Sequence, residues 1–197
     1  MRLAIVASAV GNLASVQAAV DRLGAPYDLT ADPDVIRAAS HVIFPGVGAA
    51  KAAMADVDAK GLRAVLQGLE QPLLGVCLGM QLLYEGSSEG GGIDCLGLIP
   101  SRIKLLPDRG LTIPHMGWNQ LNLKQVDHPL LRGVNNGDYV YFVHSFYAPV
   151  GAETLASADY GVEISAVVQR GNVYGCQFHP ERSGPVGARI LANFLEL

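Results

Sequence analysis

The chain has 197 residues, half of them hydrophobic, and a formal net charge of -4 at pH 7. This length suits a single domain with one large core, and no apolar run approaches the ~20 residues that a membrane-spanning helix needs. The 14 Lys and Arg residues are scattered, so the sequence predicts neither a nucleic-acid partner nor an anionic membrane surface. We therefore expect one globular domain over residues 1–197.

The first ten residues carry a basic residue, Arg2, before the apolar stretch 3–10. A basic residue followed by an apolar run is one feature of a signal peptide. The same stretch also fits a buried first strand, and it passes into a helical pattern without a cleavage-site break. The strand interpretation is therefore favoured.

Three cysteines occur along the chain: Cys77, Cys95 and Cys176. A sparse, odd number of cysteines indicates a reducing compartment, and we expect a cytoplasmic protein. No pair has CxxC spacing, which argues against a zinc or redox motif. The sequence predicts no metal and no cofactor.

Strand and helix patterns alternate through the first half of the chain. The predicted strands are residues 3–7, 27–30, 41–44 and 73–76, and the predicted helices are residues 13–23, 33–39, 50–70 with a break near Gly61, and 78–84. Strand–helix alternation with short links favours right-handed crossovers and a parallel sheet. Sheets of this kind place their chemistry beyond the carboxyl ends of the strands.

The pattern changes after the glycine-rich segment 86–92. Short β-like segments follow at residues 102–106, 119–123, 139–145, 163–169 and 173–178, and a helix over 186–197 closes the chain. No repeat or linker divides the sequence. The predicted fold class is therefore α/β: a Rossmann-like, mostly parallel central sheet flanked by helices, with an additional β-rich second half.

The segment 75–79 reads Gly-Val-Cys-Leu-Gly between a predicted strand and a predicted helix. A nucleophile on such a sharp turn needs small residues two positions before and after it, because the backbone is crowded there. The following helix would favour the Cys77 thiolate, and the Leu78 N–H could face a developing oxyanion. A small buried core cysteine is the alternative, but the position directly after a strand favours a nucleophile.

His179 and Glu181 could supply the base and the group that orients it. Pro180 disfavours the helical region for His179, so an extended chain would put the two side chains on one side. A carboxylate beside an imidazole fixes its tautomer and stabilises the imidazolium. The alternative is a surface histidine beside a solvated carboxylate, and His144, at the end of a predicted strand, is the main competing base.

Pro45-Gly46-Val47-Gly48 follows the third predicted strand. Glycines on both sides of Val47 permit unusual backbone angles and a close approach to a ligand. A backbone N–H in this loop could be the second oxyanion donor, although the segment could also be a simple tight turn. The Val47 peptide could rest with its carbonyl toward the site, in which case a partner would be needed to favour the active orientation.

The turn at 75–81, the loop at 45–48 and the segment 179–181 resemble the class I, triad-type glutamine amidotransferases, with matching order across nearly the whole chain. The resemblance implies a Rossmann-like α/β fold and release of ammonia from L-glutamine through a γ-glutamyl thioester. It makes Cys77 the nucleophile, His179 the general base and then acid, and Glu181 the orienting group.

The same resemblance implies how the substrate is held. Gln81 and Glu89 would hold the amino-acid part of glutamine, and backbone at Ser145 and Phe146 would contact its carboxylate. The oxyanion donors would come from the segment Gly46, Val47 and Gly48 and from Leu78.

A narrower resemblance comes from residues 114–119, 141–146 and 11–16. They are similar to the glutaminase subunits of imidazole glycerol phosphate synthases, from histidine biosynthesis, and Pro-His-Met-Gly-Trp-Asn at 114–119 is the most specific segment. This implies a heterodimer with a (β/α)8-barrel cyclase that uses the ammonia to form imidazole glycerol phosphate and an aminoimidazole carboxamide ribotide.

Three residues match segments that face this partner: Asn12, Met116 and Trp118. For Trp118 the alternative is ordinary core packing. The first loop departs from the Asp-Tyr-Gly type that many relatives carry, which leaves the contacts of residues 7–10 open.

Two other functions fit parts of the sequence. A glutaminase could serve another synthase, such as the one that makes pyridoxal phosphate, but residues 114–119 argue against it. A non-catalytic subunit could keep the fold, but the complete Cys-His-Glu set argues against that.

Overall fold

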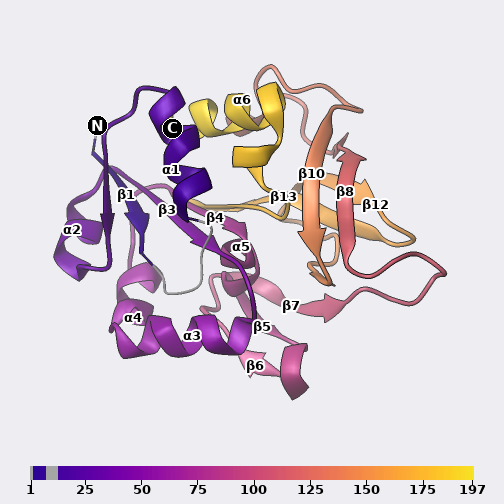
Figure 1. Cartoon of the computed structure of the whole chain (residues 1–197), viewed down its shortest axis with the longest axis horizontal. Coiled ribbons are helices and arrows are strands. Elements are labelled where there is room, and N and C mark those ends of the chain that lie inside the picture. Colours follow the sequence, from indigo (N-terminus) through magenta and orange to yellow (C-terminus); the bar gives the residue numbers. More distant parts are fainter. Residues whose placement is uncertain (1, 8–12) are drawn as a thin grey trace.

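The computed structural model describes residues 2–7 and 13–197. Within them, an eight-stranded sheet forms the centre of the fold, with the strand order β2-β1-β3-β4-β14-β13-β12-β9 (Figure 1). Its strands are β1 (Leu3–Val6), β2 (Tyr27–Thr30), β3 (His41–Gly46), β4 (Leu73–Cys77), β9 (Asn122–Leu123), β12 (Thr154–Asp159), β13 (Glu163–Arg170) and β14 (Val173–Cys176). The pairs from β2 to β14 are parallel and those from β14 to β9 are antiparallel. The predicted parallel-rich α/β sheet is confirmed.

Helices cover both faces of this sheet. In Figure 1, α1 (Leu13–Arg22) and α6 (Gly184–Leu195) lie above it, and α3 (Ala50–Ala59) and α4 (Leu62–Gln67) lie below it. The burial of β1 shows why both layers are needed: Leu3 and Ile5 join the core under α1 and α6, whereas Ala4 and Val6 join the opposite core. A strand buried on both faces must be apolar at every position, which is the pattern of residues 3–6.

The break between α3 and α4 lies where the sequence predicts it. Gly61 has φ of 67°, in the left-handed region, and α4 begins at the next residue. Glycine adopts this conformation without the steric cost of a Cβ. The predicted helix 50–70 is therefore two helices joined at Gly61.

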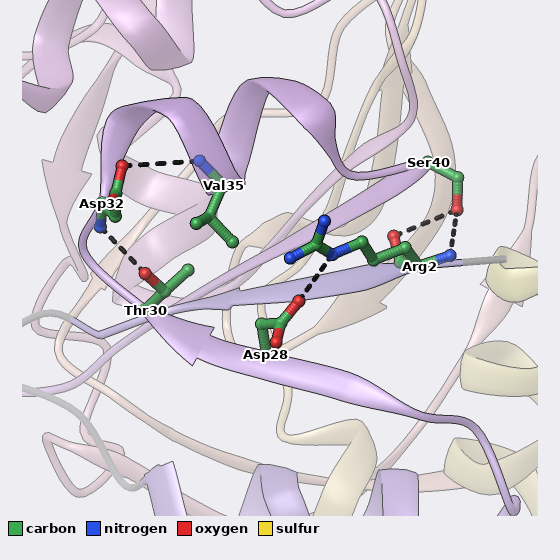
Figure 2. A network of polar contacts seen from close by, with 6 residues as sticks. All are labelled: Arg2, Asp28, Thr30, Asp32, Val35 and Ser40. Atoms are coloured by element: carbon green, nitrogen blue, oxygen red, sulfur yellow. Dashed lines mark hydrogen bonds and ion pairs between the residues drawn. The ribbon is translucent and has the colours of Figure 1, made fainter.

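Helix α2 (Pro33–Ala38) begins at a side-chain cap (Figure 2). The Asp32 carboxylate accepts hydrogen bonds from the backbone N–H groups of Asp34, at 2.8 Å, and Val35, at 3.5 Å, and Pro33 occupies the first turn. The Thr30 hydroxyl accepts from the Asp32 N–H at 2.9 Å. A cap of this kind stabilises a helix by ~1 kcal/mol and fixes the turn from β2 into α2.

Hydrogen bonds that involve side chains hold the start of β1 beside β2 and β3. The Ser40 hydroxyl accepts from the Arg2 N–H at 2.9 Å and donates to the Arg2 carbonyl at 3.1 Å, and Arg2 Nε lies 2.8 Å from Asp28 Oδ2 (Figure 2). The Arg2–Asp28 pair is exposed, so it adds ~1 kcal/mol at most. The hydrogen bonds of Ser40 therefore matter more for the position of the strand.

Two smaller sheets form the β-rich part. One pairs β8 (His115–Gln120) with β10 (Tyr139–His144), and the other has the order β11-β7-β5-β6. The strands of the second sheet are β5 (Tyr84–Ser87), β6 (Ile93–Asp94), β7 (Ile99–Leu105) and β11 (Phe146–Tyr147). Elsewhere in the fold, short 3-10 turns occur at η1 (Glu89–Gly91), η2 (Pro129–Leu131) and η3 (Pro180–Arg182).

The structure differs from the predicted elements in several places. The predicted strand 119–123 is divided between β8 and β9, which lie in different sheets. The predicted helix 78–84 ends at Leu82, where α5 (Leu78–Leu82) stops, and Tyr84 begins β5. Strand β12, which pairs with β13, was not predicted at all. Among the residues that the structure describes, no helix is both long enough and apolar enough to cross a membrane.

Candidate active site

Cys77 lies on a sharp turn between β4 and α5, as the sequence predicts. Its φ of 55° and ψ of -112° are unusual for a residue with a side chain, and such backbone costs about 1–3 kcal/mol. The glycines around it have no room for a larger residue. A Cβ on Gly75 would lie 2.7 Å from the Met80 backbone, and one on Gly79 would overlap the carbonyl oxygen of Phe44.

His179 follows β14, the neighbour of β4 in the sheet. Its backbone is extended, with φ of -93° and ψ of 96°, as Pro180 after it requires. Its Nδ1 lies 2.8 Å from Glu181 Oε1, and the two side chains are only 8% and 2% exposed. The predicted contact is confirmed, but its cause differs: Glu181 lies in the 3-10 turn η3 and not on an extended strand.

The His179 imidazole forms hydrogen bonds to two ionisable side chains, Cys77 and Glu181. Burial lowers the pKa of His179, but hydrogen bonding to Cys77 and to Glu181 raises it to about 10. The Cys77 sulfur also lies 3.7 Å from the Val143 carbonyl oxygen. The raised pKa of His179 favours an imidazolium beside the Cys77 sulfur.

One cavity of about 320 Å³ opens in front of Cys77 and His179. The predicted site residues that line it are Val47, Gly48, Cys77, Leu78, Gln81, Glu89, Ser145, Phe146 and His179. These residues come from segments up to about 130 positions apart in the sequence, and the sheet brings them to one edge. Glu181 lies on the far side of the imidazole and does not line the cavity.

Other predicted site residues lie elsewhere. Gly46 is the last residue of β3, so the strand extends into the predicted loop, and a Cβ there would lie 2.9 Å from the Gly79 nitrogen. Met116 and Trp118 are 63% and 55% exposed and line a separate groove, which excludes core packing for Trp118. Asn12 lies outside the described residues.

Gln81 and Glu89 line the cavity but also hold parts of its wall. The Gln81 amide donates to the Phe146 carbonyl at 2.8 Å and to Gln177 Oε1 at 3.0 Å. Glu89 Oε2 accepts from the Ala50 N–H at 2.9 Å, at the start of α3. The sequence prediction missed these supporting contacts, because they join residues that are 39 or more positions apart.

His144 lines the cavity, but its ring is engaged elsewhere. Its Nδ1 lies 2.8 Å from the Phe146 carbonyl oxygen and its Nε2 lies 2.9 Å from His115 Nδ1. Burial, the main cause, lowers the pKa of His144 to about 3. His144 is therefore poorly suited to be the base, and its pairing with His115 was not predicted.

The two other cysteines lie in the core. Cys95 and Cys176 are buried, and burial raises the pKa of both thiols, that of Cys95 to about 11. A raised pKa disfavours the thiolate, the reactive species. Of the three cysteines, only Cys77 lies against the cavity.

The sequence matches a known family and its members over almost its full length. Residues 5–197 match the family model of the class-I glutamine amidotransferases. The chain is 49% identical to the imidazole glycerol phosphate synthase subunit HisH of Colwellia psychrerythraea, over 98% of this chain and 92% of that protein. It is 46% identical to the HisH subunit of Vibrio cholerae, over 98% and 97% of the two chains.

Solved structures of low sequence identity share the fold. A glutamine amidotransferase superposes with a TM-score of 0.75 at 18% identity, covering 98% of this chain and 97% of that one. The glutaminase domain of Trypanosoma brucei CTPS, solved with bound acivicin, gives 0.68 at 14% identity, covering 100% and 94%. The chain is therefore a glutamine amidotransferase of class I and belongs to the family of the HisH subunits of imidazole glycerol phosphate synthase.

Proposed function

We propose that the chain is the glutaminase subunit of an imidazole glycerol phosphate synthase. It hydrolyses L-glutamine to glutamate and ammonia and delivers the ammonia to a cyclase subunit. The observation that carries this proposal is that Cys77 and His179 line one cavity while His179 Nδ1 lies 2.8 Å from Glu181 Oε1.

The reaction begins at the Cys77 sulfur. The thiolate attacks the side-chain amide carbon of glutamine, and the carbonyl oxygen becomes an oxyanion. The N–H of Leu78, at the start of α5, has no acceptor within the helix and can donate to this oxygen. Val47, which also lines the cavity, supplies the second donor, and each donor contributes ~3–4 kcal/mol to the stabilisation of the transition state.

His179 transfers the protons. The imidazolium protonates the leaving ammonia, and the neutral imidazole then removes a proton from water as the thioester is hydrolysed. Glu181 accepts from Nδ1 and so leaves Nε2 toward the sulfur. This is the orienting role that a buried carboxylate has in catalytic triads.

The cavity walls recognise glutamine through charge and backbone donors. The Glu89 carboxylate suits the α-ammonium group, and the backbone at Ser145 and Phe146 suits the α-carboxylate. Gln81 holds Phe146 in place through the bond to its carbonyl. Gly46 and Gly48 let the Val47 peptide approach the substrate, and Gly48 has φ of 86°.

The partner is a (β/α)8-barrel cyclase in a heterodimer within the cytoplasm. The relatives are named as subunits, which supports a partner subunit. Met116 and Trp118 provide an exposed apolar surface for it, and Met116 pairs across the strands with Val143, which lines the cavity. Residues 1–197 act as one glutamine amidotransferase domain.

The decisive experiment compares the wild type with Cys77→Ala, each with and without the cyclase. The wild type should use glutamine, with higher turnover when the loaded cyclase is present. Cys77→Ala should lose at least about a thousandfold in glutamine-dependent synthesis while the complex still uses free ammonium. Glutamine use that survives Cys77→Ala, or equal use with any other synthase, would contradict the proposal.

A further inference from the structure

Two buried histidines face each other across the β8–β10 pair. His115 and His144 are direct cross-strand partners and are only 3% and 6% exposed. Their rings are joined by the contact of 2.9 Å between His115 Nδ1 and His144 Nε2. Neither histidine has a part in the proton transfers described above, so this pair needs a separate explanation.

The hydrogen-bond partners allow only one arrangement of protons in this pair. The Phe146 carbonyl can only accept, so His144 Nδ1 must carry a proton. A neutral His144 then accepts at Nε2 from His115 Nδ1–H, which leaves His115 Nε2 as an acceptor. That nitrogen lies 3.3 Å from the Asn119 amide nitrogen, which can only donate.

Asn119 satisfies the end of this chain of hydrogen bonds. Its amide nitrogen also donates to the Asp159 carbonyl at 2.8 Å, and its oxygen accepts from the Gln120 N–H at 2.8 Å. Both hydrogens of the amide are therefore used, one on Asp159 and one on His115. A second proton on either ring would set two donors against each other and break the chain.

Aromatic rings hold His115 in this position. It stacks against Phe142 on one side, at 4.6 Å between centroids, and against Tyr160 on the other, at 3.9 Å. Burial lowers the pKa of His115 to about 4, and burial is also the main cause of the low pKa of His144. Both rings are therefore neutral at neutral pH, in agreement with the hydrogen-bond pattern.

The chain of hydrogen bonds ends at the wall that holds the substrate. The Phe146 carbonyl accepts from His144 Nδ1 at 2.8 Å and from Gln81 at 2.8 Å. These two bonds fix the Phe146 carbonyl, and both Ser145 and Phe146 line the cavity. Loss of one bond would leave this wall with more freedom without touching Cys77 or His179.

The other end of the chain lies behind the exposed surface of β8. Side chains alternate along a strand, so His115 and the half-buried Asn119 lie on one side of β8, and the exposed Met116 and Trp118 lie on the other. A displacement of β8 by a partner would therefore act on His115 and, through His144, on Phe146.

We propose that His115 and His144 form a neutral, directionally ordered pair that positions the Phe146 backbone for substrate binding. They are positioning residues, and the proposal rests on the glutaminase function. Protons sit on Nδ1 of both rings, and the pair connects the inner side of β8 with the substrate wall.

The first test reads the tautomers and needs no activity. Ring ¹⁵N spectra of the full chain should show both histidines neutral at pH 7, with Nδ1 protonated and Nε2 bare. His115→Phe keeps a stacked ring but removes the donor to His144 Nε2, so the His144 Nε2 signal should shift as this hydrogen bond is lost, while Nδ1 stays protonated by its bond to Phe146. A charged ring or Nε2–H in either wild-type residue would overturn the proposal.

The second test uses a matched pair of variants in complex with the cyclase. His144→Phe and His144→Asn both lose the contact to His115, but the Asn amide can replace Nδ1–H as the donor to Phe146. We expect KM for glutamine to rise about tenfold in His144→Phe, the equivalent of one lost buried hydrogen bond. His144→Asn should stay within about threefold, and kcat should change little in either variant.

Thermal unfolding of both variants checks that they fold. Equal KM values in two folded variants would overturn the positioning role, and so would a fall in kcat alone. If the wild type itself fails to hydrolyse glutamine, the proposed function fails, whereas the ¹⁵N spectra still decide whether the pair is neutral and ordered.

Discussion

Cys77 combines a strained backbone with a position against the cavity. Its left-handed φ of 55° turns the sulfur out of β4 and into the cavity, while only 6% of the residue is exposed. Strain of this kind persists only where the surrounding structure fixes it. Here the close packing at Gly75 and Gly79 fixes it, because α5 folds directly back against β3 and β4.

His179 links the chemistry of the site to the stability of the fold. Burial lowers the pKa of His179 in the folded chain, but Cys77 and Glu181 outweigh this effect and raise the pKa to about 10. An imidazole in the unfolded chain has a pKa of about 6.5. A raised folded pKa contributes stability that is fully present below about pH 6.5 and is lost as the pH rises toward 10.

Glu181→Gln tests this linkage. The amide oxygen can still accept from His179 Nδ1, but the negative charge that favours the imidazolium is gone. The variant should therefore unfold at a lower temperature than the wild type at about pH 6, and the difference should narrow as the pH approaches about 10. Thermal unfolding followed by circular dichroism across this range measures it.

Glu196→Gln is the matched control for that series. Glu196 pairs with Arg132 on the surface, and an arginine stays charged throughout the range. Its effect on the melting temperature should be small and constant with pH. A constant difference for Glu181→Gln as well would show that the carboxylate does not favour the imidazolium.

The positions of Cys77, His179 and Glu181 in the fold could be predicted from the sequence because each belongs to a short motif. The turn around Cys77 and the segment 179–181 are local patterns, and the structure brings them together as strands β4 and β14 become neighbours. The pairing of His115 with His144 could not be predicted. It depends on the register of two strands whose residues lie 29 positions apart.

At the scale of elements, helix α5 shows how packing can outweigh helix propensity. Alanine is favoured over glycine within a helix by ~1 kcal/mol. Gly79→Ala would nevertheless place its Cβ on the Phe44 carbonyl oxygen, a backbone atom that cannot move without β3. We expect a loss of about 3 kcal/mol in the free energy of unfolding, measured by urea titration, together with loss of glutaminase activity.

Gly151→Ala is the control for this substitution. Gly151 lies in an exposed loop, and a Cβ there would meet only the Glu153 carboxylate at 3.5 Å, an ordinary contact. Its free energy of unfolding should stay within ~0.5 kcal/mol of the wild type. If Gly79→Ala were equally mild, the close packing of α5 against β3 would not be what shapes the turn.

Helix α3 starts without a capping side chain of its own. Its N-cap residue is Ala49, and the Glu89 carboxylate supplies the acceptor for the Ala50 N–H. Glu89 therefore joins the cavity wall to the segment that follows the Val47 loop. One carboxylate can serve both the helix and the α-ammonium group of glutamine.

Two variants separate these roles. Glu89→Gln keeps an acceptor for Ala50 but loses the charge, so KM for glutamine should rise at least about tenfold at nearly unchanged stability. Glu89→Ala loses both, and its free energy of unfolding should fall by ~1 kcal/mol in addition. Steady-state kinetics and urea titration measure the two effects. If Glu89→Gln and the wild type had equal KM values for glutamine, Glu89 would have no role in substrate binding.

The elements that the sequence failed to predict have weak local signals. Strand β12 reads Thr-Leu-Ala-Ser-Ala-Asp, in which Ala and Asp are depleted in strands, and its pairing with β13 decides its conformation. Tyr84 continues an apolar helical pattern, but its backbone pairs with Ile99 in β7. Tertiary pairing overrides local propensity in both cases.

At the scale of the whole molecule, the cavity and the exposed apolar surface meet at the β8–β10 sheet. Strands β8 and β10 lie side by side in Figure 1. Pro114, Val143 and His144 line the cavity, and Met116 and Trp118 of β8 are exposed. Large exposed apolar side chains at one site indicate an interaction surface. Ammonia leaving this side of the cavity would therefore meet whatever covers β8.

Trp118→Ala tests whether the cyclase covers this surface. A tryptophan buried at the centre of an interface typically contributes 2 kcal/mol or more, so we expect the dissociation constant to rise about 30-fold, measured by isothermal titration calorimetry. Leu29→Ala is the control. Leu29 is 42% exposed on β2, an edge strand of the central sheet, whereas Trp118 lies on β8 in the separate β8–β10 sheet. Because Trp118 packs edge-on to Tyr141 and not in the core, the variant should keep its fold. Equal affinities for both variants would place the cyclase on another face.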